Sequence, residues 1–157
     1  MDARPHVCDA VIVEVVHMSQ DIRDEKEKKK DDRDVLDVLK FELKFLEDGG
    51  YGRSPRTPWR ASYVFEDSLS CPNFCDPAKP HPCDECLLIQ FVPKALREQE
   101  VPCRFIPLTE EGETVDHLYR AGTQVELEAA LASWLRKQIG RIERERSQAA
   151  QKQEARA

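Results

Sequence analysis

The feature that most constrains this chain is a concentration of cysteines in its middle. Five of the six cysteines in the 157-residue sequence lie between residues 71 and 103. Cys83 and Cys86 are separated by two residues, and Cys71 and Cys75 by three. A CxxC pair forms a tight turn that directs both sulfurs at one ion, and zinc takes four thiolate or imidazole ligands in a tetrahedron. The spacing therefore predicts a structural zinc site between residues 71 and 103.

The two cysteine pairs supply the expected metal ligands, which are Cys71, Cys75, Cys83 and Cys86. His81 lies between the pairs and is a possible substitute, because a neutral imidazole in place of one thiolate leaves less negative charge on the site. Cys103 is a second possible substitute, since the chain could fold back and bring it to the same ion. Prolines in the connection between the pairs restrict the unfolded chain and make the loop easier to close on a metal.

Three other roles for the cysteines stay open. An iron–sulfur cluster also takes four cysteines, and a reactive or buried unpaired thiol needs only one. Disulfides are the third role, but six cysteines in 157 residues fall well below the share of about 8–10% that is typical of disulfide scaffolds. An iron–sulfur or thiol redox protein is therefore kept as an alternative to structural zinc.

Length and charge indicate one domain with extensions. We divide the chain into an N-terminal strand and charged linker (1–34), a globular domain with the metal centre (35–143) and a polar tail (144–157). The apolar run at 11–16 is too short for a signal sequence, and nothing approaches the roughly 20 apolar residues of a membrane span. We expect a soluble cytoplasmic protein without a membrane segment.

Two stretches have the apolar periodicity of amphipathic helices. Leucines recur at three- and four-residue intervals over residues 35–47, and two glycines then provide a stop. Thr123 and Glu126 form a capping box before a second apolar face that runs from Leu127 to Ile142. We expect these two helices to pack together, with the chain fraying beyond Ile142.

The segments around the cysteines have the composition of strands. The runs 61–65, 87–92 and 101–108 are short and rich in branched or aromatic residues, with prolines near their ends. A cysteine turn that leads into two short strands resembles a zinc ribbon in outline over Cys71–Leu108. The expected fold class is α+β, with a small metal-stapled strand pair flanked by two amphipathic helices.

The expected function is a non-catalytic protein-interaction module. Familiar catalytic signatures such as GxSxG and HExxH are absent from the sequence. The partner would be another protein, or a second copy bound through the amphipathic helices. A loop with interleaved aromatics could instead bind nucleic acid through Arg53, Arg56 and Arg60. The net charge of −6 disfavours that alternative.

Overall fold

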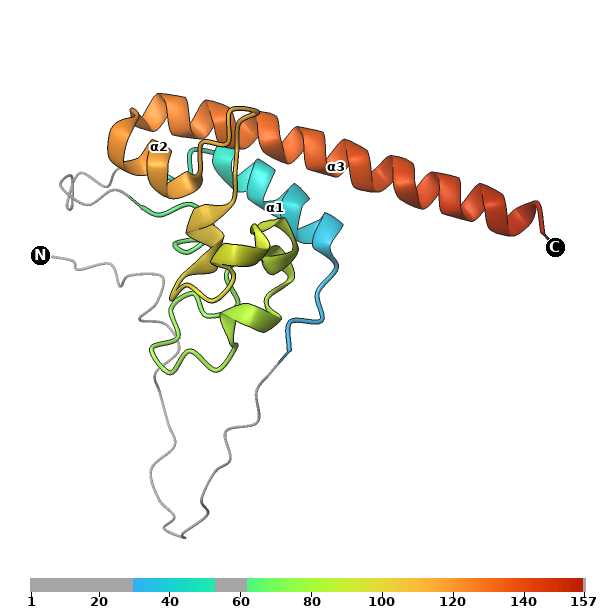
Figure 1. The fold of residues 1–157 in the computed structure, drawn as a ribbon, viewed down its shortest axis with the longest axis horizontal. Helices are drawn as coiled ribbons and strands as arrows, with labels where there is room; N and C mark the ends of the chain where they lie inside the picture. The colour runs from blue at the N-terminus through green and yellow to red at the C-terminus, as the bar shows by residue number, and fades with distance from the viewer. Residues whose placement is uncertain (1–29, 53–61, 157) are drawn as a thin grey trace, which may run out of the picture.

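The computed structural model describes residues 30–52 and 62–156, and these ranges are mainly helical. The α-helices are α1 (Val35–Glu47), α2 (Val115–Ala121) and α3 (Gln124–Glu154). Four short 3-10 helices lie between α1 and α2, namely η2 (Cys83–Glu85), η3 (Leu87–Phe91), η4 (Lys94–Leu96) and η5 (Pro102–Phe105). In Figure 1, α1 and α2 lie next to the first half of α3, and the C-terminal end of α3 projects past the rest of the chain.

Helix α1 confirms the first predicted helix. Its N-terminus is capped by the Asp34 carboxylate, which accepts hydrogen bonds from the backbone N–H groups of Leu36 and Asp37. The chain leaves the helix through Gly49, whose φ of +77° lies in the left-handed region that glycine adopts most easily. Both ends are therefore set by local sequence signals.

Helix α3 confirms the capping box but is longer than expected. The Thr123 side chain accepts from the backbone of Glu126, and the Glu126 carboxylate accepts from the backbone of Thr123. The predicted fraying beyond Ile142 is wrong, because the helix continues through Glu154 with its last turns exposed. These turns contain alanine, glutamine, glutamate and arginine, all good helix formers.

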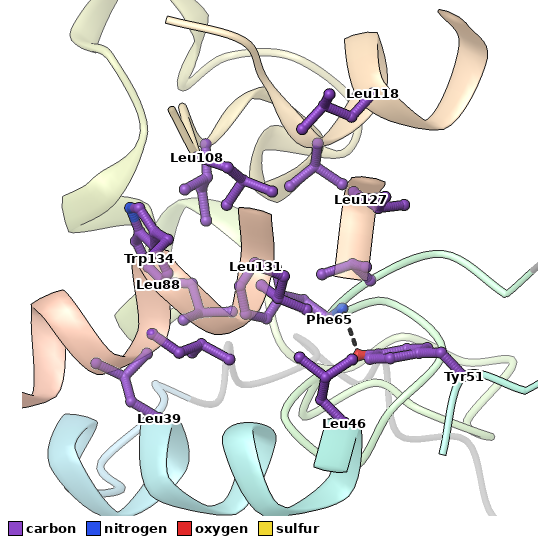
Figure 2. Close-up of a cluster of buried hydrophobic side chains, with 14 of the residues drawn as sticks. Leu39, Leu46, Tyr51, Phe65, Leu88, Leu108, Leu118, Leu127, Leu131 and Trp134 are labelled. Carbon is purple, nitrogen blue, oxygen red and sulfur yellow. Dashed lines mark hydrogen bonds between the residues drawn. The ribbon is translucent and has the colours of Figure 1, made fainter. Parts of the chain in front are cut away.

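Helices α1 and α3 pack on each other, as the sequence predicted. Leu39 of α1 and Leu131 of α3 are fully buried in one core, shown in Figure 2. Ion pairs border this contact, with Arg136 of α3 at 2.8 Å from Glu47 of α1. We refer to α1 and α3 together as the helical scaffold.

The predicted α+β fold is wrong within the described ranges. They contain no strand, and β-type pairing is limited to an isolated bridge between Pro107 and Thr114. The run 87–92 instead forms successive i→i+3 hydrogen bonds, from the Ile89 N–H to the Cys86 carbonyl and from the Val92 N–H to the Ile89 carbonyl. Short apolar runs do not distinguish strand from helix by periodicity alone, and the zinc-ribbon outline fails for this reason.

The remaining strand predictions divide between described and undescribed residues. Of the run 61–65, residues 62–63 have no regular structure and residues 64–65 lie in a turn. Phe65 itself has a φ of +65°, which is incompatible with a strand. The strand expected at 11–16 lies outside the described residues.

The segment between α1 and α2 joins the scaffold through aromatic contacts. Trp134 of α3 meets Phe91 edge-to-face at 5.0 Å between ring centroids, and Phe65 at 6.0 Å. Leu88 and Ile106 are buried in the same core. These contacts set the segment that carries the cysteines against one face of α3.

A buried carboxylate provides a second link between scaffold and segment. Glu42 of α1 is fully buried and accepts hydrogen bonds from the hydroxyl groups of Tyr51, Ser68 and Ser70. The Tyr51 oxygen in turn accepts from the Phe65 N–H at 2.9 Å, the bond drawn in Figure 2. Burial raises the pKa of the Tyr51 hydroxyl, and the negative charge of Glu42 raises it further. The hydroxyl therefore stays protonated and can donate to Glu42.

Candidate metal centre

Four free cysteines gather around one cavity. They are Cys71, Cys83, Cys86 and Cys103, each of them partly buried. The cavity has a volume of about 730 Å³ and is lined by all four side chains. Every pair among the four is close enough for the negative charge of one thiolate to raise the pKa of another. The structure therefore assembles four thiols that are up to 32 positions apart in the sequence, from residue 71 to residue 103.

Short helical turns place three of these thiols. Cys83 begins η2, Cys86 directly precedes η3, and Cys103 lies in η5. Two sulfurs also receive backbone N–H groups, Cys71 from Asn73 and Cys86 from Leu88. An N–H donor favours the ionised sulfur, so these two positions are suited to a metal-bound thiolate.

The fourth predicted ligand, Cys75, differs from the other three. It lines the cavity, but it is exposed and its sulfur is engaged in a disulfide. The structure thus brings together Cys71, Cys83 and Cys86 as predicted and adds Cys103, one of the two proposed substitutes. Cys75 itself has a φ of +60°, in the left-handed region of backbone conformation.

His81, the other proposed substitute, also lines the cavity. Its backbone is held by the side chain of Asn73, which accepts from the His81 N–H at 2.9 Å and donates to the His81 carbonyl at 2.6 Å. Asn73 therefore ties the two ends of the 73–81 loop together. Nothing in the sequence distinguishes Asn73, since asparagine is common in proline-rich loops.

Burial raises the pKa of all four free thiols. For Cys86 the pKa rises to about 11. Cys71, Cys83 and Cys103 shift in the same direction for the same principal reason. Without a metal, these side chains are protonated near neutral pH and are poor nucleophiles. This disfavours a catalytic thiol among the four.

Residues 31–33, on the N-terminal side of α1, form a strap that contacts the chain just ahead of Cys71. The Arg33 guanidinium donates to the backbone carbonyls of Leu69 at 3.1 Å and Ser70 at 2.7 Å, just ahead of Cys71. It also pairs with Asp31 at 2.8 Å, a carboxylate whose side chain is only 2% exposed. The sequence analysis placed both residues in the charged linker, and the structure joins them to the chain just ahead of Cys71.

The strap also places a positive charge, that of Arg33, beside two of the thiols. Burial by itself would raise the pKa of Asp31, but the hydrogen bonds and charge of Arg33 outweigh it and the pKa lies below its ordinary value. Hydrogen bonding to Asp31 is the main reason that the pKa of Arg33 is raised, and the charges of Cys86 and Cys71 add to it. Arg33 is therefore a fixed cation beside two of the thiols, where it would offset thiolate charge.

A second ion pair links two parts of the chain that line the cavity. Arg104 follows Cys103 directly and binds both carboxylate oxygens of Glu66, at distances from 2.7 to 3.0 Å. The guanidinium also stacks on the ring of Tyr63, 3.9 Å from its centroid. These contacts fix Cys103 relative to the chain around Glu66.

The free thiols line one cavity but are not grouped around one ion. Among the residues that the structure describes, no three His, Cys, Asp or Glu side chains lie close enough together to hold one metal ion. The four free thiols are therefore candidate ligands that share one cavity.

The predicted anion-binding arginines, Arg53, Arg56 and Arg60, lie outside the described residues. The nucleic-acid alternative stays a prediction.

Comparison with known proteins identifies no relative of this chain. No protein-family model, no curated protein and no solved structure matches the chain. In the described part of the chain, none of the helices combines the length and apolar character that a membrane span requires.

Proposed function

We propose that this protein is a non-catalytic protein-interaction module whose cysteine segment, residues 71–103, is held in shape by a thiolate-bound metal. The observation that carries the proposal is the gathering of Cys71, Cys83, Cys86 and Cys103 around one cavity. Four thiolates provide the ligands of a closed structural zinc site and equally those of an iron–sulfur cluster. The structural role does not depend on which of these is bound.

A structural role fits the number of ligands. A catalytic zinc site keeps one position open for water or substrate and uses three protein ligands. Four cysteines around a shared cavity would fill every position. We also propose a cytoplasmic location, because reducing compartments keep thiols available for a metal; the disulfide of Cys75 does not support this part of the proposal.

A structural role also fits the weakness of the cysteine segment on its own. Its backbone is held by isolated turns, and its regular structure consists of 3-10 helices of three to five residues. Structural zinc contributes an apparent binding free energy of about 10–16 kcal/mol in small metal-dependent domains. A metal would therefore supply stability that short turns do not.

The partner surface is proposed away from the apolar faces of the helices. Those faces pack on each other within one chain, so we place the partner surface elsewhere and keep a dimer through the amphipathic helices as the alternative. Phe41 and Leu69 are instead exposed at 39% and 62% and line one shallow groove, which also includes Arg33 and Asp37. Exposed apolar side chains with a charged rim are typical of protein contact surfaces.

Metal analysis of three purified proteins tests the metal centre. We expect metal in the wild-type chain, retention in Cys75→Ser, and loss of most of it in Cys103→Ser. Equal metal contents in the two variants would contradict the ligand set, and a metal-free wild-type protein would contradict the proposal itself.

Paired surface substitutions test the interaction role. Phe41→Asp with Leu69→Asp should abolish self-association in sedimentation, or capture of a protein partner, whichever the wild-type chain shows. Val125→Asp is the matched control, because Val125 is 76% exposed and lies outside the groove. An unchanged result in the double variant would place the contact elsewhere, and absence of both activities in the wild type would contradict an interaction role.

A further inference from the structure

We infer that metal binding controls the shape of the groove lined by Phe41 and Leu69, and that the strap of residues 31–33 transmits this control. The inference rests on the proposed function and deepens it by naming how the interaction is regulated. Its basis is that the strap contacts the backbone beside two expected metal ligands and also lines the groove.

One wall of the groove is a turn that ends at an expected metal ligand. The Cys71 N–H donates to the Ser68 carbonyl at 3.0 Å and closes the turn. Leu69 and Ser70 form the corner of this turn, and both line the groove. Leu69 is 62% exposed there. A metal bound to Cys71 would therefore fix the last residue of the turn that presents Leu69.

The strap joins this turn to a second ligand position. Arg33 donates to two carbonyls at the corner of the turn, at 3.1 and 2.7 Å. Asp31, which pairs with Arg33 at 2.8 Å, accepts from the Leu87 N–H at 3.5 Å. Leu87 directly follows Cys86. Binding of Cys71 and Cys86 to one metal centre would therefore fix both stretches of backbone that the strap contacts, and with them the Arg33 side chain in the groove.

The opposite wall of the groove belongs to the helical scaffold. Phe41 lies on α1, which is held by apolar packing against α3, so this wall should keep its place when metal is removed. The hydroxyl groups of Ser68 and Ser70 donate to Glu42 of α1 with or without a metal. The turn therefore stays attached to the scaffold, and loss of metal should shift Leu69 without unfolding the groove.

Coupling between two sites is reciprocal, so a partner in the groove should also slow the release of the metal. Such couplings typically change an affinity by about 5–150-fold. Because Glu42 holds part of the turn independently of the metal, we expect an effect near the lower end of this range. The partner contact should be about 5–10-fold tighter with metal than without it.

A zinc titration of the full chain, freed of metal by a chelator under reducing conditions, provides the test. The methyl groups of leucine are isotope-labelled, and Leu69→Met assigns the Leu69 signals in the NMR spectrum. We expect these signals to move in proportion to zinc uptake. In Arg33→Gln, zinc should still bind but the displacement should fall by more than half. Lys40→Gln, which breaks an exposed ion pair with Glu143, is the matched control and should respond like the wild type.

The Arg33→Gln variant also separates the strap from simple proximity to the metal. A direct effect of zinc on Leu69 would persist in this variant, so an undiminished displacement would overturn the inference. Circular dichroism checks that the helices are intact. If they are not, Asp31→Asn weakens the other end of the strap and is held to the same criterion.

The outcomes distinguish this inference from the function on which it rests. Zinc uptake by the wild-type chain without any displacement of the Leu69 signals would overturn the coupling and leave the structural metal centre standing. A chain that contains no metal as isolated and takes up no zinc would overturn both the coupling and the proposed function.

Discussion

The helical scaffold and the cysteine segment are stabilised in different ways within one small chain. In the scaffold, regular helices bury a stripe of leucines, and Leu39, Leu131 and Leu135 are fully excluded from solvent. In the cysteine segment, 3-10 turns and single hydrogen bonds hold the backbone, and the four free thiols are only partly buried. The scaffold can fold by burying apolar surface. The cysteine segment depends instead on side-chain hydrogen bonds and ion pairs and, in our account, on a metal.

The difference shows why a chain of this size needs a second source of stability. Short turns fix many backbone dihedrals and bury few side chains in return, so conformational entropy is poorly offset. The aromatic cluster around Trp134 and the buried carboxylate of Glu42 are among the contacts that join the scaffold to the chain between α1 and α2. Substitutions on either side of these contacts should show how much each region contributes to the stability of the chain.

The largest effect is expected from a cavity in the scaffold. Leu131→Ala removes a fully buried side chain from the core that the three α-helices share, so it should lower the free energy of unfolding by about 2–5 kcal/mol. Urea denaturation followed by circular dichroism measures this. Val125→Ala, at an exposed site on the same helix, is the control. Equal stability of the two variants would contradict the proposed core.

A smaller loss is expected where the regions join. Glu42→Ala leaves the hydroxyl groups of Tyr51, Ser68 and Ser70 without their shared acceptor, and the expected destabilisation is about 2–3 kcal/mol. Hydrogen exchange should rise in residues 64–70 more than in α3. Glu47→Ala removes an exposed carboxylate from the same helix and should change stability by less than about 0.5 kcal/mol. A similar loss of stability in both variants would contradict a role for Glu42 in joining the scaffold to the chain that follows it.

The strap should affect the cysteine segment alone. Arg33→Gln removes the donors to the Leu69 and Ser70 carbonyls, and we expect about 1 kcal/mol of lost stability. The more specific readout is metal release, which should become faster in a chelator while the circular dichroism of the helices stays unchanged. Lys40→Gln breaks an exposed ion pair of the scaffold and serves as the control. Equal release rates in both variants would exclude a role for Arg33 at the centre.

The smallest effect is expected at the end of α3. Residues 147–156 are exposed throughout, so truncation after Arg146 should change the free energy of unfolding by less than about 0.5 kcal/mol. Metal content should also be unchanged. A large loss of either would mean that this end of the helix contributes to the fold.

The sequence predicted the scaffold well and the segment only in part. Leucine periodicity and the Thr123–Glu126 capping box are local signals, and both helices follow from them. The run 87–92 failed because its apolar residues suit a strand, while the turn at Cys83–Cys86 leads it into i→i+3 bonding. Local composition contains no information on such a neighbour effect.

The candidate site was predicted by residue type more than by geometry. Cys71, Cys83 and Cys86 follow from spacing, and Cys103 was reachable only as an alternative because it is 17 positions beyond Cys86. Asn73, Arg33 and Asp31 act through contacts with residues that are distant or in loops. No pattern within one stretch of sequence marks such residues.

Hydrogen exchange before and after metal removal tests the central contrast most directly. The wild-type chain would be measured with its metal and again after treatment with a chelator under reducing conditions. We predict that protection is lost in residues 71–103 and largely retained in α1 and in the first half of α3. Uniform loss across both regions, or unchanged protection in the cysteine segment, would contradict the account.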